Sequence, residues 1–463
     1  MKLPNKVVSD GQLANLMKRE VELFKKRTPK SAKAFLEAGD VLLNGVPMPW
    51  MSDWNSPHPI YVDTASGNCI TDIDGNTYID FCLGDTGAMF GHSPPATAAA
   101  VCEQVHKGIT TMLPSEDAPW VARELGRRFG LPYWQVAMTA TEANRYVIRI
   151  CRTLTQRPKT LVFNECYHGS LDEALVHLDA NGQVALRCEF DSNPGLVKDS
   201  VARVVEFNDV SVLEEALSHE DVACILAEPV MTNCGMVLPE PGYHDELREL
   251  ATKYGTYLII DETHTFSSGP GGYTAAHGLK PDFITLGKSI AGGIPVAVYG
   301  FTAQIAKQIN ASFGRKPVSD PMGIGGTLAA NAFAINAIRA TLTNVATEEA
   351  FKKMIAGANR MADGLEAAIN KRDLAWSVTR CGARAEMQFM PHPPRKGSEA
   401  KAAVDWDLIA YTHLYLANRG ILVTPFHNMM LVSPVTTDED IILLVKTWDD
   451  CMAGLVAAGR KNV

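Results

Sequence analysis

The sequence predicts an α/β fold in which a large, mostly parallel sheet is covered by helices. Between about residues 134 and 301, short apolar stretches rich in β-formers alternate with helical stretches, a pattern typical of parallel sheets. The chain of 463 residues is also long enough for two domains. We expect 1–95 to be an N-terminal segment and part of a small α+β domain, 96–340 the large domain, and 341–463 the rest of the small domain.

The first expected element is an amphipathic helix, because Leu13, Leu16, Val21 and Phe24 recur at helical spacing. A hairpin follows, since NCITDI and TYIDFC flank Gly75, which readily supplies a turn. The central strands are then expected at 134–138, 160–163, 222–228, 256–261, 282–286 and 296–301.

Helices are expected between these strands, and one of them covers 243–254 and stops before Gly255. After about residue 335 an alanine-rich helix is followed by strand-like stretches at 386–390 and 430–434. The capping pattern of Thr437 and Asp440 marks the start of the final helix.

The amino-acid composition indicates a soluble globular protein and argues against several classes of binding partner. Hydrophobic residues make up 46% and charged residues 21%, as in soluble globular proteins. The net charge of −9 argues against nucleic-acid and anionic-membrane partners. Ten cysteines without metal-like spacing indicate reduced thiols of a cytoplasmic protein and no metal site. We see no secretory signal and no apolar run long enough to span a bilayer.

Polar residues follow the expected strands at their carboxyl ends, where open α/β sheets bind ligands. Each has an ordinary explanation by itself: a helix cap, a turn, a core aromatic ring or a surface lysine. Their shared location indicates a site instead. They are Thr139, Ala140, Thr141, Tyr167, His168, Glu228, Asp261 and Lys288.

Pyridoxal phosphate accounts for this set of residues. It needs a lysine to form an imine, an acid facing the ring nitrogen, a flat side chain against the ring, and a phosphate cradle. Lys288 lies between two strand-like stretches, where a desolvated amine becomes nucleophilic near neutral pH. The hydroxyl-rich helix start at 139–141 is a suitable anion site.

A series of short motifs extends this reading. They are DIDGNTYIDFCLGDTGAMFGHSPP, TATEANRYVIR, YHG, AEPVMTNCG, IIDETHTF, TLGKSIAGGIPVAVYG and GGTLAANAFA, in that order. The series resembles class III (fold type I) pyridoxal-phosphate-dependent aminotransferases, in particular the branch around glutamate-1-semialdehyde aminomutase, over about residues 59–436. The resemblance implies a homodimer with active sites at the interface.

The resemblance also implies roles for single residues. Lys288 would be the Schiff-base lysine and Asp261 the partner of the ring nitrogen. Tyr167 and Thr263 would cover the two ring faces, with Thr263 standing where the family often has valine. Thr139, Ala140 and Thr141 would hold the phosphate, with Ala140 in place of the family's glycine. Glu142 and Asn233 would lie near the cofactor, and Thr327 would reach the neighbouring subunit's phosphate. From their place after the strands, His168 and Glu228 are also expected to bind the cofactor.

The substrate region departs from the aminomutase pattern. Trp50 and Met51 lie where the aminomutase has a carboxylate-binding arginine, and the stretch TPFHNMM lacks the aminomutase's glutamate. The aromatic residues Trp50, Trp54 and Phe426 would suit an apolar amine or ketone, or they pack the small domain. Arg384 is the remaining candidate for a carboxylate, or it forms a structural ion pair.

We therefore expect a pyridoxal-phosphate-dependent aminotransferase that moves an amino group from a primary amine or amino acid to a ketone, aldehyde or keto acid. The alternatives are a glutamate-1-semialdehyde-type 2,1-aminomutase, which moves the group within one molecule, and a lyase that releases ammonia. A binding protein that retains only the fold is disfavoured, because the lysine, aspartate and tyrosine are all present.

Overall fold

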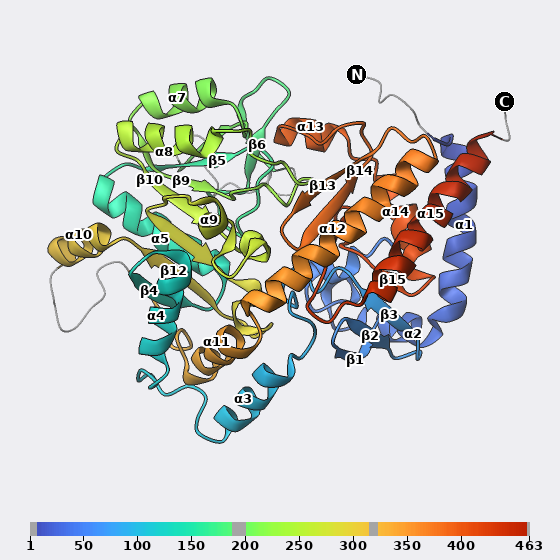
Figure 1. Ribbon diagram of the computed structural model, residues 1–463, viewed down its shortest axis with the longest axis horizontal. Coiled ribbons are helices and arrows are strands. Elements are labelled where there is room, and N and C mark those ends of the chain that lie inside the picture. Colours follow the sequence, from blue (N-terminus) through green and yellow to red (C-terminus); the bar gives the residue numbers. More distant parts are fainter. Residues whose placement is uncertain (1–6, 188–200, 314–322, 461–463) are drawn as a thin grey trace. The chain divides into compact units, whose positions relative to one another are not determined.

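The computed structural model describes residues 7–187, 201–313 and 323–460 (Figure 1). Its internal contacts divide the chain into two compact units. The larger unit comprises Pro95–Phe351 and Pro394–Lys401, and the smaller unit comprises Met1–Pro94, Lys352–Pro393 and Ala402–Val463. Compared with the expected boundaries, residues 341–351 and 394–401 fall in the larger unit.

A seven-stranded sheet forms the centre of the larger unit, with strand order β4-β12-β11-β10-β9-β5-β8. The neighbouring pairs from β11 to β8 are parallel, whereas β12 runs antiparallel to β11 and β4. The sheet is therefore mostly parallel, as predicted. Its strands are β4 (Tyr133–Ala137), β5 (Lys159–Phe163), β8 (Ala202–Val205), β9 (Val222–Ala227), β10 (Tyr257–Asp261), β11 (Phe283–Leu286) and β12 (Ala297–Phe301).

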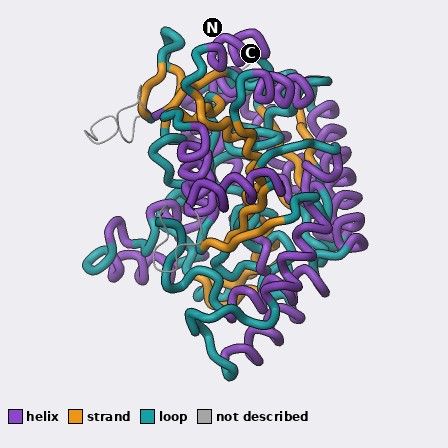
Figure 2. Tube along the Cα trace, turned by 90° about the vertical axis from the view of Figure 1, so that its left-hand side faces the viewer, coloured by secondary structure: helices purple, strands orange, loops and turns teal. Residues whose placement is uncertain are grey.

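The sheet is covered on both faces, because every residue of β9 is buried and strand side chains alternate between faces. Helix α5 packs on β4, β9, β10, β11 and β12, while α7 packs on β8 and α8 on β10. Figure 2 shows strands lying among helices. The helices are α3 (Pro95–Val105), α4 (Ala118–Phe129), α5 (Ala140–Thr155), α7 (Val210–Ser218), α8 (Tyr243–Lys253), α9 (Gly272–His277), α10 (Ala303–Phe313) and α11 (Ala332–Asn344).

Shorter elements complete the larger unit. The strands β6 (Val176–Leu178) and β7 (Val184–Leu186) form an antiparallel ribbon. Two 3₁₀ helices follow the central strands, η4 (Thr265–Ser268) after β10 and η5 (Lys288–Ala291) after β11. Helices α12 (Glu348–Lys371) and α13 (Gly397–Ala402) each begin in the larger unit and end in the smaller one.

The smaller unit joins the two ends of the chain. Strands β2 (Cys69–Asp72) and β3 (Thr77–Asp80) form the predicted hairpin, and β3 pairs in parallel with β15 (Ile421–Leu422). The remaining elements are β1 (Val62–Ser66), β13 (Ser377–Cys381), β14 (Arg384–Gln388), β16 (Met429–Leu431), η1 (Leu43–Gly45), η2 (Pro49–Ser52), α1 (Asp10–Arg27), α2 (Pro29–Ala38), α14 (Trp406–Ala417) and α15 (Asp438–Arg460).

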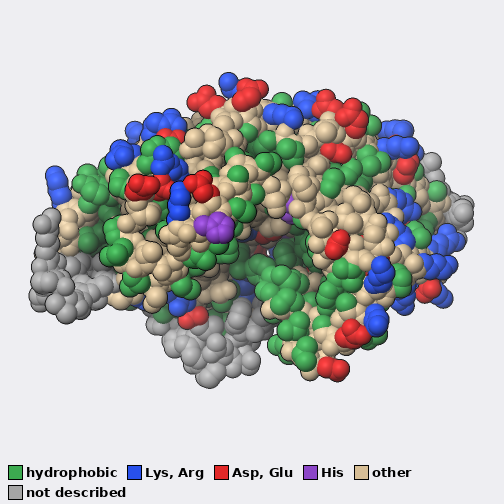
Figure 3. Space-filling view, turned by 90° about the horizontal axis from the view of Figure 1, so that it is seen from below, with side chains coloured by type: hydrophobic (Ala, Val, Ile, Leu, Met, Phe, Trp, Pro, Cys, Tyr) green, Lys and Arg blue, Asp and Glu red, His purple; other side chains and the backbone are tan. Residues whose placement is uncertain are grey.

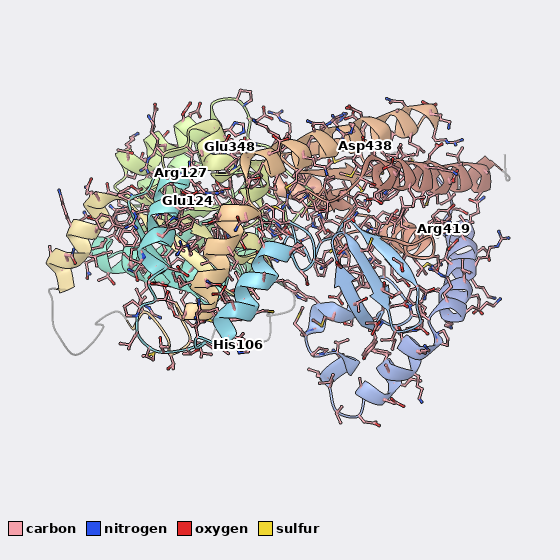
Figure 4. All side chains as sticks on the ribbon, turned by 60° about the horizontal axis from the view of Figure 1, so that its bottom comes forward. His106, Glu124, Arg127, Glu348, Arg419 and Asp438 are labelled. Carbon is pink, nitrogen blue, oxygen red and sulfur yellow. The ribbon has the colours of Figure 1, made fainter. Side chains whose placement is uncertain are left out.

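Polar contacts reinforce this union of the chain ends. Arg419, labelled in Figure 4, follows α14 and donates to the Glu20 carboxylate of α1 at 2.9 Å. Asn418 donates to the same oxygen at 2.7 Å. The predicted cap of α15 is present, since the hydroxyl of Thr437 accepts from the backbone N–H of Asp440 at 3.2 Å.

The surface carries charge of both signs, and basic and acidic side chains are mixed on the face shown in Figure 3. Within the described part of the chain, every helix is too short or too polar to cross a membrane. The nine cysteines of that part are all free thiols.

Candidate active site

The parallel strands of the larger unit bring their carboxyl ends to one edge of the sheet, where loops can hold a ligand. Strands β4, β5, β9, β10 and β11 point the same way. The segments that follow them carry the candidate residues. These are Thr139, Ala140 and Thr141 after β4; Tyr167 and His168 after β5; Glu228 and Asn233 after β9; Asp261 and Thr263 at β10; and Lys288 after β11.

Asp261, the last residue of β10, accepts hydrogen bonds from several directions. His168 Nδ1 lies 3.0 Å from Asp261 Oδ2, and Asn144 Nδ2 donates to the same oxygen at 2.9 Å. The backbone N–H of Thr263 donates to the other oxygen at 3.0 Å. Burial opposes ionisation, but His168 and the other donors outweigh it and hold the pKa of Asp261 at about 2. Asp261 is therefore a fixed, buried anion.

His168 is the charged partner of this anion. Burial by itself would lower the pKa of His168, but attraction to Cys166 and Asp261 raises it to about 10. Because a carboxylate can only accept, Nδ1 is the donor in the bond to Asp261. The other ring nitrogen, Nε2, is buried and has no hydrogen-bond partner among the described residues.

Asn144 was not among the residues predicted from the sequence. Its Nδ2 donates to Asp261 and to the His168 carbonyl at 3.1 Å, and its Oδ1 accepts from the Thr285 hydroxyl at 2.6 Å. It therefore ties α5 to β10 and β11. The sequence could have indicated this role, because Asn144 lies three positions before Val147 and therefore on the apolar face of the helix. Both residues are buried in the structure, and a buried amide must be hydrogen-bonded.

Lys288 begins η5, directly after β11, and is half-buried. Its backbone has a φ of 49°, a left-handed conformation that costs a residue with a side chain about 1–2 kcal/mol. The preceding Gly287 lies so close to α5 that a Cβ there would be 3.0 Å from the Ala140 Cβ. The lysine is thus presented on a strained turn packed against the start of α5.

His264 is a second residue that the sequence analysis missed. It lies three positions after Asp261, is 6% exposed, and precedes η4. Its Nε2 is 2.7 Å from Lys288 Nζ. The position alone gave no signal, because a histidine after a buried strand is more often a core residue than a partner of a lysine.

The start of α5 combines a helix cap with a close backbone turn. The Thr139 hydroxyl accepts from the Glu142 N–H at 3.2 Å, and the Glu142 carboxylate accepts from the Met138 N–H at 2.8 Å. The Thr141 hydroxyl accepts from the Ser170 N–H at 3.2 Å. Thr139 is therefore a true N-cap, and the first N–H groups of the helix are directed at this edge of the sheet.

Glu228 is buried close enough to His168 and Asp261 for their charges to act on its carboxyl group. Its carboxylate accepts from the Thr232 hydroxyl at 2.6 Å and from Asn233 Nδ2 at 3.1 Å. Burial raises the pKa of Glu228, while the charge of His168 acts in the opposite direction. Tyr167 is half-buried in the turn after β5, and Thr327 lies in an exposed turn on a separate segment.

The candidates for the substrate region lie in the smaller unit. Trp50 and Phe426 contact each other edge to face, with ring centroids 5.4 Å apart, and Trp54 is half-buried. Arg384 is fully buried on β14 and donates to the Thr86 hydroxyl at 3.1 Å and to the Met429 sulfur at 2.9 Å.

The donor set of the larger unit fits pyridoxal phosphate. A lysine, a fixed carboxylate, a tyrosine and a capped helix start surround one edge of the sheet. The buried Thr263 hydroxyl and His168 Nε2 have no protein partner within the described residues, as expected of groups that face a polar ligand.

Comparisons with known proteins identify relatives along nearly the whole chain. Residues 50–451 match the family model for class III aminotransferases. A glutamate-1-semialdehyde 2,1-aminomutase of Desulfitobacterium hafniense (strain Y51) is 31% identical over 92% of this chain and 98% of its own.

Two solved structures have the same fold. A glutamate-1-semialdehyde aminomutase from Pseudomonas aeruginosa PAO1, a lysine-to-alanine variant in complex with PMP, is 48% identical with a TM-score of 0.95 and covers 97% of this chain and 99% of its own. A β-phenylalanine aminotransferase from Variovorax paradoxus is 25% identical with a TM-score of 0.84, and covers 97% of this chain and 98% of its own.

Proposed function

Because the chain belongs to the class III aminotransferases, a family of pyridoxal-phosphate-dependent enzymes, we propose that it moves an amino group between neighbouring carbons of one small molecule. The reaction is that of a glutamate-1-semialdehyde 2,1-aminomutase. The observation that supports this choice is the 48% identity to the Pseudomonas aeruginosa aminomutase over nearly the whole chain. The names of the relatives thus favour the aminomutase alternative over the transaminase expected from the sequence.

We assign the cofactor's reactive end to Asp261 at the end of β10 and to Lys288 after β11. Lys288 would hold the aldehyde carbon, and the Asp261 anion would keep a proton on the ring nitrogen. When bound, pyridoxal phosphate supplies a ring that withdraws the electron pair of a substrate C–H bond. Once the substrate has displaced Lys288 from the cofactor, the free Lys288 amine would move the proton that leaves this carbon. His168 and Asn144 fix the Asp261 carboxylate during these steps.

The remaining candidates position the cofactor. Tyr167 and Thr263 would lie against the two ring faces, and the Thr263 hydroxyl would be the polar group on its side. The N–H groups of Ala140 and Thr141 would bind the phosphate at the start of α5. Glu228 and Asn233, which are hydrogen-bonded to each other, would lie beside the cofactor.

Transamination between a separate donor and acceptor is the second candidate function. It is favoured by the edge-to-face contact of Trp50 and Phe426 and by the lack of an acid in the stretch 424–430. Aromatic rings of this kind suit contact with an apolar or aryl-bearing amine better than with an acidic substrate. Arg384 then serves as a buried structural residue or as a carboxylate ligand.

We further propose that the enzyme is a cytoplasmic homodimer. The free cysteines of the described residues support a reducing compartment. The exposed Thr327 turn supports a role for this residue in the site of a second subunit.

The decisive experiment incubates the purified, cofactor-loaded enzyme with glutamate-1-semialdehyde and no other amino donor or acceptor. An aminomutase forms the isomer with the amino group on carbon 1 and a ketone on carbon 2. The product is identified by mass spectrometry and NMR, and Lys288→Ala serves as the inactive control. Ammonia is measured in the same samples, because a lyase would release it stoichiometrically.

A panel of amines with a keto acid is tested in parallel. Isomer formation without an acceptor supports the aminomutase. Conversion only of a donor and acceptor pair overturns it in favour of transamination. Activity that survives in Lys288→Ala at the wild-type rate would contradict the role of this lysine in either reaction.

A further inference from the structure

His264 and Lys288 form a close pair at the ends of two neighbouring strands. Strands β10 and β11 are parallel and in register, with Asp261 opposite Thr285, so that the loops after them lie side by side. His264 lies in the loop after β10, and Lys288 lies in the loop after β11. The distance between His264 Nε2 and Lys288 Nζ is 2.7 Å. The histidine is 6% exposed, which limits the movement of its ring.

A distance of 2.7 Å between these nitrogens requires one donor and one acceptor. An ammonium can only donate, and a neutral imidazole has one accepting nitrogen. The pair therefore exists either as an ammonium donating to His264 Nε2 or as a neutral amine beside a protonated ring. One proton moves along the hydrogen bond between these two forms, and neither heavy atom has to move.

We propose that His264 is the positioning residue of Lys288 and its proton acceptor. Lys288–NH₃⁺ and neutral His264 become Lys288–NH₂ and His264–H⁺, so the proton and the charge are conserved. The electron pair of the amine then accepts the hydrogen bond from His264 Nε2–H, and it attacks an aldehyde carbon when that bond opens. This inference rests on the proposed function, in which Lys288 holds the cofactor.

The other ionisable groups at this edge are already engaged. Asp261 accepts from His168 and Asn144, and Glu228 accepts from Thr232 and Asn233. Further groups on the adjoining segments are also bonded, Glu142 to the Met138 N–H, and Glu262 to the Thr265 hydroxyl and the Thr274 N–H. His264 is a described base that directly contacts the Lys288 amine.

The test measures capture of pyridoxal phosphate by the apoenzyme, a readout that does not depend on catalysis. The captured cofactor is fixed by borohydride reduction, and the modified peptide is quantified by mass spectrometry between pH 5 and pH 10. The variant is His264→Gln, whose amide can accept a hydrogen bond but cannot take a proton at these pH values. His277→Gln is the matched control, because His277 lies on the exposed side of α9 and stacks on Tyr273.

In the wild type we expect capture at Lys288 to persist toward lower pH than in His264→Gln. The midpoint of the capture curve should rise by about one pH unit in the variant, which is about tenfold slower capture on the acidic side. His277→Gln should follow the wild-type curve. Identical curves for wild type and His264→Gln would overturn the proposal and leave the role of Lys288 intact.

The experiment also separates the inference from the proposed function. If the reduced cofactor is found on another lysine or on none, both are overturned. Thermal melting establishes that each variant is folded at the assay temperature. Should His264→Gln fail this check, His264→Asn replaces it under the same criterion, because the shorter amide also cannot accept a proton.

Discussion

Asp261 and His168 show how one residue pair can set the pH range of a site. The pKa of His168 is raised from 6.5 to about 10, so its contribution to stability is complete below pH 6.5 and is lost as the pH rises through 10. The pKa of Asp261 is lowered from 3.8 to about 2, so its contribution is present above pH 3.8 and is lost as the pH falls through 2. The pair therefore stabilises most between about pH 4 and 6.5.

We predict that His168→Gln lowers the free energy of unfolding of the apoenzyme by about 3 kcal/mol near pH 6, because it leaves the Asp261 carboxylate buried without its charged partner. The difference from wild type should shrink toward pH 10, where the wild-type imidazolium is also lost. Urea denaturation at pH 6, 8 and 10 measures both quantities. A difference that stays constant over this range would contradict the ionised pair.

Some residues of the site could be predicted from the sequence, and others could not. Lys288 and Asp261 were predicted because their chemistry is required and they follow apolar strands. Asn144 and His264 were missed because their importance arises from contacts between segments far apart in the chain, Asn144 with Asp261 and His264 with Lys288. The cap formed by Thr139 was recognised because it depends only on local spacing.

Gly287, which follows β11, packs closely against Ala140 at the start of α5. A Cβ on Gly287 would lie 3.0 Å from the Ala140 Cβ and 3.3 Å from its backbone nitrogen. The Ala140 N–H is one of the groups proposed to bind phosphate. A side chain at Gly287 would therefore press on the proposed phosphate site.

We predict that Gly287→Ala lowers the free energy of unfolding by about 1–3 kcal/mol and weakens pyridoxal phosphate binding. Gly454→Ala is the control, because this glycine lies within α15 and a Cβ there meets nothing within 4 Å. The control should be stabilised by about 0.5–1 kcal/mol. Urea denaturation and spectral titration give the two values. Unchanged cofactor affinity in Gly287→Ala would argue against this position of the phosphate.

The alternation of apolar and helical stretches predicted most strands of the seven-stranded sheet, but it did not predict every strand of the molecule or the direction of each strand. Strand β9 was recognised because all its residues are apolar and buried on both faces. Strand β1 was missed, since it is mostly exposed and carries no apolar alternation. The reversed direction of β12 could not be predicted from the sequence, because an apolar run rich in β-formers shows that a strand exists and not which way it runs beside its neighbours.

At the scale of the whole molecule, the proposed dimer makes a direct prediction. Light scattering should give a mass of twice the 50.3 kDa chain. Thr327→Ala should keep this mass but bind pyridoxal phosphate less tightly, whereas Thr327→Ser, which retains the hydroxyl, should bind as the wild type does. A monomer with full cofactor affinity would contradict a site completed by Thr327 of a second subunit.

The pairing of β3 with β15 has a consequence for the synthesis of this protein. Ile79 lies opposite Ile421, so the first strands leave the ribosome long before their partner exists. The hairpin of β2 and β3 must therefore wait with an open edge, which is a hazard for aggregation. The larger unit, made mostly of the continuous stretch Pro95–Phe351, can fold meanwhile. The smaller unit therefore cannot be completed before β15 has been made, which comes after the whole of the stretch Pro95–Phe351.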